Sequence, residues 1–163
     1  MSSNHQGTPA MLALNEAGVP FEVATYEHDP DVANFGQEAA DALGMSPETV
    51  FKTLVVQTDL DQDHGLVVAV LPVAHQLSLK RAAVAVGAKK ARMADPADVE
   101  RVTGYVVGGV SPLGQKRALR TVIDESAEAL DRMAVSGGRR GVDLLLDPAD
   151  LARVAHATFH PLT

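Results

Sequence analysis

A single lysine inside an apolar run is the first residue whose type and position suggest chemistry. Lys52 lies in the strand-like run at residues 50–56, and strand alternation puts it on the same face as Leu54 and Val56. A lysine on an apolar face must extend to solvent, pair with an acid or point into a polar cavity. In a cavity its ammonium group could hold a phosphate or a ribose. The structural alternative, extension to solvent or ion pairing, stays as open as this functional role.

Two glycine-rich segments could present backbone N–H groups to an anion. They span residues 108–114 and 136–141, and they contain Gly108, Gly109, Ser136, Gly137 and Gly138. Each follows a predicted strand. Glycine permits positive φ and close backbone approach, so consecutive N–H groups can converge on an anionic oxygen, as in phosphate nests and oxyanion holes. The alternative is that both segments are hairpin turns without a ligand.

The sequence offers no convincing enzyme nucleophile. It contains no cysteine, so disulfides, cysteine-ligated zinc and an enzyme thiol are excluded. Ser111 precedes Pro112, which lacks the N–H that a hydrolase elbow uses as an oxyanion donor, and neither Ser111 nor Ser136 lies in a GxSxG context. The six histidines show no metal-ligand spacing. We therefore expect neither a bound metal nor a cofactor.

Length and composition predict one ordinary domain. With 163 residues and 46% hydrophobic content, the chain can bury a core without metal or disulfide support. We expect residues 1–163 to form a single domain, with residues 1–7 as a disordered tail. The first residues lack the apolar stretch of a secretory signal, and no apolar run reaches the roughly 18 residues of a membrane span. We expect a cytoplasmic protein without a membrane partner.

Charges of the two signs are segregated along the chain. Residues 22–63 carry ten acidic residues against the single cation Lys52, whereas residues 80–140 carry twelve cations and seven acids. The net charge of −7 therefore leaves room for a basic face on an acidic protein. The alternative is that these charges only solvate helix surfaces, so charge alone does not identify a nucleic-acid partner.

Periodicity and capping signals predict an α+β domain. Helices are expected at residues 9–17, 35–43, 78–86, 96–102 and 148–155, and strands at residues 21–28, 50–57, 66–71, 105–107, 121–123, 133–135, 142–146 and 158–159. The polar break at residues 59–64 predicts that the second and third of these strands pair as a hairpin. These elements must position Lys52 and the two glycine segments.

An ordered set of short motifs resembles a known family. The motifs are Asn34-Phe35-Gly36, Lys52-Thr53-Leu54, Gly87-Ala88-Lys89-Lys90, Met93-Ala94-Asp95-Pro96, Thr103-Gly104-Tyr105, the segment 108–116 and the segment 136–143. Together they resemble the YbaK-type Cys-tRNA(Pro) deacylases of the YbaK/aminoacyl-tRNA synthetase-associated domain superfamily. The likeness extends from Thr8-Pro9 to Phe159.

This resemblance implies a fold and a set of site residues. The implied fold is a central mixed, partly curled sheet flanked by helices, with the aminoacyl end of a tRNA bound near Lys52. The implied catalytic residues are Lys52, Gly108, Gly109 and Asp143, and the implied substrate-binding residues are Tyr26, Phe35, Ser136, Gly137 and Gly138. Asp143 is a candidate general acid, base or orienting group, or else a surface salt-bridge partner. Tyr26 and Phe35 are also compatible with plain core positions.

The resemblance also implies a reaction without an enzyme nucleophile. In such a reaction the thiol of a misattached cysteine attacks its own ester, which leaves a cyclic thiolactone and free tRNA. The chain's lack of cysteine agrees with this expectation. The expected partner is the 3′ end of tRNA(Pro), and prolyl-tRNA synthetase is a further candidate partner. Two alternatives remain: editing of another small aminoacyl group such as alanine, and a non-catalytic module that binds tRNA or a synthetase.

Overall fold

A five-stranded mixed sheet forms one half of the molecule. The computed structural model describes residues 7–163, and the expected tail at residues 1–7 lies almost wholly outside them. The strand order is β4-β2-β3-β5-β8. The strands are β2 (Phe51–Thr58), β3 (Leu66–Pro72), β4 (Ala91–Met93), β5 (Arg120–Asp124) and β8 (Thr158–His160). β2 pairs antiparallel with β3 and β4, whereas β3–β5 and β5–β8 are parallel pairs. The predicted hairpin of β2 and β3 is confirmed.

A three-stranded antiparallel sheet forms the other half. Its order is β1-β7-β6, and the strands are β1 (Glu22–Thr25), β6 (Met133–Arg139) and β7 (Val142–Leu146). The sheets meet at the start of β2, where Val50 forms an isolated parallel bridge with Ala134 and the Ala134 N–H donates to the Thr49 carbonyl at 3.0 Å. The strands therefore curl from one sheet towards the other. The predicted fold class, α+β with a mixed, partly curled sheet and flanking helices, is confirmed.

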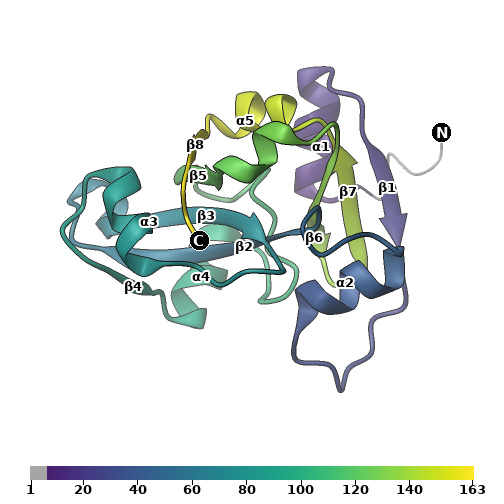
Figure 1. Ribbon diagram of the computed structural model, residues 1–163, viewed down its shortest axis with the longest axis horizontal. Helices are drawn as coiled ribbons and strands as arrows, with labels where there is room; N and C mark the ends of the chain where they lie inside the picture. Colours follow the sequence, from purple (N-terminus) through teal and green to yellow (C-terminus); the bar gives the residue numbers. More distant parts are fainter. Residues whose placement is uncertain (1–6) are drawn as a thin grey trace.

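In the described part of the chain, five α-helices flank the sheets. They are α1 (Pro9–Ala17), α2 (Phe35–Leu43), α3 (Leu79–Val86), α4 (Pro96–Thr103) and α5 (Pro148–Ala155). In Figure 1, α3 and α4 lie with the five-stranded sheet on the left, whereas α1 and α2 lie with the three-stranded sheet on the right. The side chain of Asn34 accepts a bond from the Gln37 N–H and so begins α2 beside the start of β2. Gly44, in the left-handed conformation, ends this helix.

Alternation along β2 divides the core between the two faces of its sheet. Phe51 and Val55 belong to the large cluster between the two sheets, whereas Val56 belongs to a second cluster under α3. A third, smaller cluster joins α2 to Val50 and to one face of the three-stranded sheet. Because successive side chains of a strand point to opposite faces, Lys52 and Thr53 must project to different sides of β2.

Two sequence-based predictions for the glycine segments need correction. Residues 105–107 form no strand; the Tyr105 hydroxyl instead donates to the Leu113 carbonyl at 2.7 Å, which holds this segment as a packed loop. The second segment is not a simple turn, because β6 continues through Gly137 and Gly138. A register shift between Ser136 and Arg139 accommodates the glycines as a bulge, and the chain reverses only after Arg139.

The short strand β4 was not predicted. It holds only three residues, Ala91 to Met93, and pairs with β2 from Val56 to Thr58. Alanine, arginine and methionine are not β-branched, so local propensity gave no signal for a strand. Because β4 stops there, the remaining part of this edge of β2 stays open.

Candidate functional site

A pocket of about 560 Å³ lies beside the open edge of β2. Its walls come from the start of α2, the first residues of β2, the segment after β4, the loop at residues 107–110, and the strands β6 and β7. This volume lies in the range of small-molecule sites, which are mostly apolar with a few converging polar groups. The pocket therefore joins both sheets at the place where the chain curls from one to the other.

The pocket gathers six of the nine site residues expected from the sequence. They are Tyr26, Phe35, Lys52, Gly108, Ser136 and Asp143. The other three, Gly109, Gly137 and Gly138, do not line it. Gly109 and Gly137 are buried, so they contribute to packing behind the pocket wall. Whether any of the nine acts on a substrate stays a prediction.

The open edge of β2 supplies one wall. At one end the Thr49 carbonyl accepts from the Ala134 N–H, and at the other end the Val55 carbonyl accepts from the Ala94 N–H at 3.1 Å. Backbone groups of alternate residues point to the same edge, so those of Phe51 and Thr53 face the gap between these two bonds. β4 pairs only with residues 56–58 of β2, so no strand of the described residues 7–163 pairs with these groups. They are available to a ligand in the pocket.

Thr53 adds a buried hydroxyl to this wall. Its Oγ1 is buried and has no hydrogen-bond partner within residues 7–163. Buried polar groups without a partner are rare in native structures, and they often mark a place where a ligand or water binds. The sequence gives Thr53 no role beyond its place in the Lys52-Thr53-Leu54 motif, because its lack of a partner follows from the pairing of β2 and not from its residue type.

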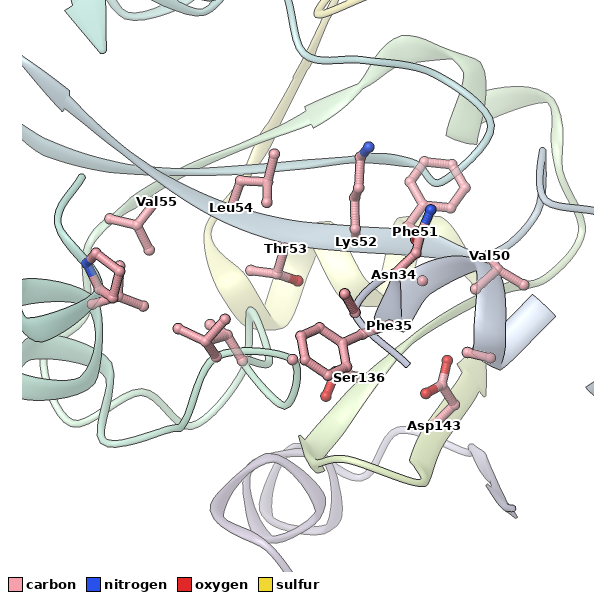
Figure 2. A pocket seen from close by; sticks show the side chains of 18 of the residues that line it. Asn34, Phe35, Val50, Phe51, Lys52, Thr53, Leu54, Val55, Ser136 and Asp143 are labelled. Carbon is pink, nitrogen blue, oxygen red and sulfur yellow. The ribbon is translucent and has the colours of Figure 1, made fainter. Parts of the chain in front are cut away.

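Lys52 projects from the other side of the same strand. Figure 2 shows the side chains of Lys52 and Leu54 rising from one side of β2, with Thr53, Ser136 and Asp143 on the other. The face shared with Leu54 agrees with the predicted alternation. Lys52 forms no ion pair with any residue from 7 to 163, and burial lowers the pKa of its amino group below the usual value. The ion-pair alternative therefore lacks a partner in this part of the chain.

Asp143 lies at the centre of the three-stranded sheet. It pairs with Ser136 on β6 and with Ala24 on β1, and it is only 5% exposed. Among residues 7–163, no hydrogen bond or ion pair involves its carboxylate. Burial raises the pKa of Asp143 to about 7, because a charged carboxylate loses hydration there. The surface salt bridge that was an alternative for Asp143 is therefore not present.

Tyr26 responds to the same environment. Burial raises the pKa of its phenol, and the nearby negative charge of Asp143 raises this pKa further. Its backbone N–H donates to the Gly141 carbonyl at 3.0 Å, which ties the end of β1 to the turn before β7. Tyr26 therefore stays a neutral phenol that can donate a hydrogen bond beside Asp143.

Phe35 connects α2 with both glycine segments. A Cβ at Gly108 would lie 2.8 Å from the Phe35 ring, so the glycine backbone packs directly on that ring. The guanidinium carbon of Arg140 lies 4.7 Å from the ring centroid, in a cation–π arrangement. A Cβ at Gly109 would lie 2.7 Å from the Arg139 Cα, so the two glycine segments pack against each other. The sequence identified both segments, and the structure brings them together.

The serines lack the environment of a nucleophile. Ser111 is fully buried and its Oγ accepts a bond from the Leu113 N–H at 3.3 Å. The Oγ of Ser136 accepts from the Gly138 N–H at 3.2 Å, which stabilises the bulge in β6. Neither hydroxyl has a histidine partner among residues 7–163. A hydrolytic reaction in this pocket would need a nucleophile from water or from the substrate.

No three or more His, Asp or Glu side chains from residues 7–163 cluster as a metal site would require. Within the same residues, none of the helices has the length and apolar character needed to cross a bilayer.

Comparison with known sequences gives consistent matches along the chain. The sequence profile of the aminoacyl-tRNA editing domain matches residues 29–154. The chain is 34% identical over 158 residues to EbsC of Enterococcus faecalis, a proposed Cys-tRNA(Pro)/Cys-tRNA(Cys) deacylase, covering 97% of this chain and 94% of that protein. It is 29% identical over 155 residues to the multifunctional Ser/Thr-tRNA deacylase ProXp-y of Escherichia coli K12, covering 94% and 89% of the two proteins.

Solved structures agree with these matches. One, described as a proposed trans-editing enzyme for prolyl-tRNA synthetase, superimposes with a TM-score of 0.81 at 25% identity and covers 95% of this chain and 94% of that one. A second, of a hypothetical protein, gives a TM-score of 0.83 at 23% identity over 95% and 99% of the two chains, and it supports the fold alone.

Proposed function

The chain belongs to the aminoacyl-tRNA editing domain family, and on this premise we propose that it is a trans-editing deacylase that acts on Cys-tRNA(Pro). The match to EbsC, a proposed deacylase of cysteinyl-tRNAs, supports cysteine as the aminoacyl group. The likeness to a proposed trans-editing enzyme for prolyl-tRNA synthetase supports tRNA(Pro) as the carrier. Prolyl-tRNA synthetase is accordingly a candidate partner.

The observation that carries this proposal is the composition of the pocket. Its walls include Lys52, whose side chain projects from the far side of β2, the open backbone edge of β2 and the buried carboxylate of Asp143. The first can hold a phosphate or ribose, and the second can bond the aminoacyl group. The pocket contains no enzyme thiol and no serine activated by a histidine. This donor set suits binding and orientation of an ester that carries its own nucleophile.

In the proposed reaction the cysteinyl thiol supplies that nucleophile. Its sulfur attacks the ester carbonyl carbon, the bond from this carbon to the ribose oxygen breaks, and the thiol proton ends on the ribose hydroxyl. The products are a cysteine thiolactone and free tRNA. Holding the sulfur against the carbonyl gives the advantage of an intramolecular reaction. The N–H of Gly108 is the candidate donor to the developing oxyanion, and Asp143 is the candidate acceptor for the thiol proton.

This chemistry would also account for selectivity. Discrimination between cysteine and proline by size alone is worth roughly 1 to 3 kcal/mol. A reaction that requires a side-chain thiol leaves prolyl-tRNA(Pro) intact, whatever its fit to the pocket. The 29% identity to a Ser/Thr-tRNA deacylase makes seryl and threonyl groups a second candidate substrate class.

The test measures deacylation of Cys-, Ser-, Thr-, Ala- and Pro-tRNA(Pro) by the purified protein. S-methylcysteinyl-tRNA(Pro) is the matched control, because it retains the sulfur but has no thiol proton. We expect release of cysteine, no release of proline and at least a tenfold loss on S-methylation. Equal release from the methylated substrate would contradict the thiol mechanism. Release of serine, threonine or alanine in preference to cysteine would change the substrate assignment, and no release from any substrate would favour a binding module.

A further inference from the structure

Arg140 holds one carbonyl of the pocket wall with two hydrogen bonds. Its Nε and Nη2 donate to the Val107 carbonyl oxygen at 2.9 Å and 2.7 Å. Its guanidinium carbon also lies over the Phe35 ring, 4.7 Å from the ring centroid. Arg140 is exposed, and an exposed arginine loses conformational entropy when it is held by a carbonyl and a ring together. The contact therefore has a cost, and we expect it to serve a role at the edge of the pocket.

The contact determines the direction of the neighbouring peptide N–H. Val107 C=O and Gly108 N–H belong to one planar trans peptide unit, so they point in opposite directions. With the carbonyl held by Arg140, the Gly108 N–H must point away from the guanidinium group. No acceptor for it is found among residues 7–163, whereas the next amide, Gly109 N–H, donates to the Val106 carbonyl at 2.9 Å. Gly108 lines the pocket, so its N–H is an unpaired donor in the pocket wall.

Phe35 prevents the same peptide from rotating. Gly108 has a φ of 88°, and a Cβ at this position would lie 2.8 Å from the Phe35 ring and 2.9 Å from the Arg140 Nε. The peptide is therefore enclosed between an aromatic ring on α2 and a guanidinium group from the turn after β6. Any rotation would break both bonds to the Val107 carbonyl or move the glycine into the ring.

We propose that Arg140 is a positioning residue that fixes the Val107–Gly108 peptide so that the Gly108 N–H donates to the oxyanion of the aminoacyl ester. This inference rests on the proposed deacylase function. A cation bound to the carbonyl end of a peptide also polarises that peptide, which strengthens its N–H as a donor. Preorganised donors of this kind are among the largest contributions to acyl-transfer catalysis.

The alternative role for Arg140 is a direct contact with a tRNA phosphate. Such a contact depends on charge, and lysine can replace arginine as a point charge. The positioning role depends on the planar fork of the guanidinium group, which reaches one oxygen with two donors while it lies over the Phe35 ring. Substitution by lysine therefore separates the two roles.

The experiment compares Arg140→Lys with the matched control Arg139→Lys. Arg139 is also exposed, and its side chain forms no hydrogen bond or ion pair within residues 7–163. We expect Arg140→Lys to lower kcat on Cys-tRNA(Pro) about tenfold or more, with KM changed less than about twofold and the salt dependence of KM unchanged. Arg139→Lys should leave kcat at the wild-type value. Wild-type kcat in Arg140→Lys, or a loss confined to KM with a reduced salt slope, would overturn the proposal.

A second readout does not depend on deacylation. The amide resonance of Gly108 in a ¹H–¹⁵N spectrum reports the orientation and polarisation of this peptide. We expect Arg140→Lys, and not Arg139→Lys, to shift this resonance and to leave most others in place. An unchanged Gly108 resonance would overturn the positioning role. A wild-type protein that deacylates no aminoacyl-tRNA would instead overturn the proposed function, and the resonance would then still report whether Arg140 fixes the peptide.

Discussion

The two charged walls of the pocket differ in how the protein holds their charge. Lys52 projects from the face of β2 that it shares with Leu54, is partly exposed and can reach water, and burial lowers the pKa of its amino group. Asp143 lies at the centre of the three-stranded sheet, is 5% exposed and has a pKa raised to about 7. Figure 2 shows the two side chains on opposite sides of β2. The charges are kept apart, and neither neutralises the other.

This difference indicates two separate tasks. An ammonium group that stays hydrated until substrate arrives can exchange water for a phosphate or ribose oxygen at little cost. A carboxylate that is buried without a partner is destabilising in the folded protein, and it becomes useful when a bound substrate offers it a proton or a donor. The wall formed by β2 therefore suits binding of the tRNA end. The wall formed by the three-stranded sheet, which carries Asp143, suits proton transfer at the aminoacyl group.

The largest effect is expected from removal of the Lys52 ammonium. Lys52→Ala should lower kcat/KM on Cys-tRNA(Pro) roughly 100-fold or more, because the charge that anchors the tRNA end is lost. Lys52→Arg keeps the charge and should retain more activity than the alanine variant. Deacylation rates at saturating and subsaturating substrate separate the effects on kcat and KM.

The matched control for this variant is Lys80→Ala. Lys80 is an exposed residue on α3 and forms no ion pair within residues 7–163. Lys80→Ala should retain wild-type kcat/KM. Wild-type activity in Lys52→Ala would mean that Lys52 does not bind the tRNA end, and the separate task assigned to it would be wrong.

The two walls also differ in what the sequence could predict. Lys52 stood out as a lone cation in an apolar strand, and alternation placed it with Leu54, as the structure shows. Asp143 was expected only through family resemblance, although an acid inside the apolar run Val142–Leu146 was a signal of the same kind. The strand periods and helix-capping signals predicted most elements, because these signals are local.

The parts that could not be predicted depend on contacts between distant segments. The bond of Arg140 to the Val107 carbonyl spans 33 positions, and nothing local to either residue indicates it. The open edge of β2 depends on where β4 ends, and β4 itself has no strand propensity. Residues 105–107 have the composition of a strand, but the Tyr105 hydroxyl bonds within the loop and no strand lies beside them. Tertiary context overrode propensity at each of these places.

The second largest effect is expected from the charge of Asp143 and concerns stability. A carboxyl group whose pKa is raised in the folded state holds its proton when the unfolded chain, with a pKa near 4, has already lost it. The free energy of unfolding should therefore fall as the pH rises from about 4 to about 7. Asp143→Asn removes this charge, so it should be more stable than wild type by up to about 4 kcal/mol at pH 8 and similar to it at pH 4.

Denaturant unfolding of both proteins at a series of pH values measures this difference. Asp131→Asn is the control, because Asp131 is exposed and forms no ion pair within residues 7–163. That variant should follow wild type at every pH. A constant stability difference between wild type and Asp143→Asn from pH 4 to pH 8 would mean that ionisation of Asp143 does not destabilise the folded protein. Asp143 would then not differ from Lys52 in the way described above.

The smallest expected effect concerns Thr53, where the two walls meet across the edge of β2. Its Oγ1 has no partner within residues 7–163, so Thr53→Val should not destabilise the free protein and should raise its free energy of unfolding by up to about 1 kcal/mol. If the hydroxyl bonds the bound aminoacyl group, the same change should lower kcat/KM about threefold to tenfold. Thr53→Ser keeps the hydroxyl and should retain activity.

Thermal unfolding and deacylation are measured on both variants. For Thr53→Val we expect stability to rise and activity to fall, because the hydroxyl is left unpaired in the free protein for a ligand to bond. Loss of both would instead indicate a structural bond, and loss of neither would mean that the β2 wall acts through Lys52 and its backbone alone.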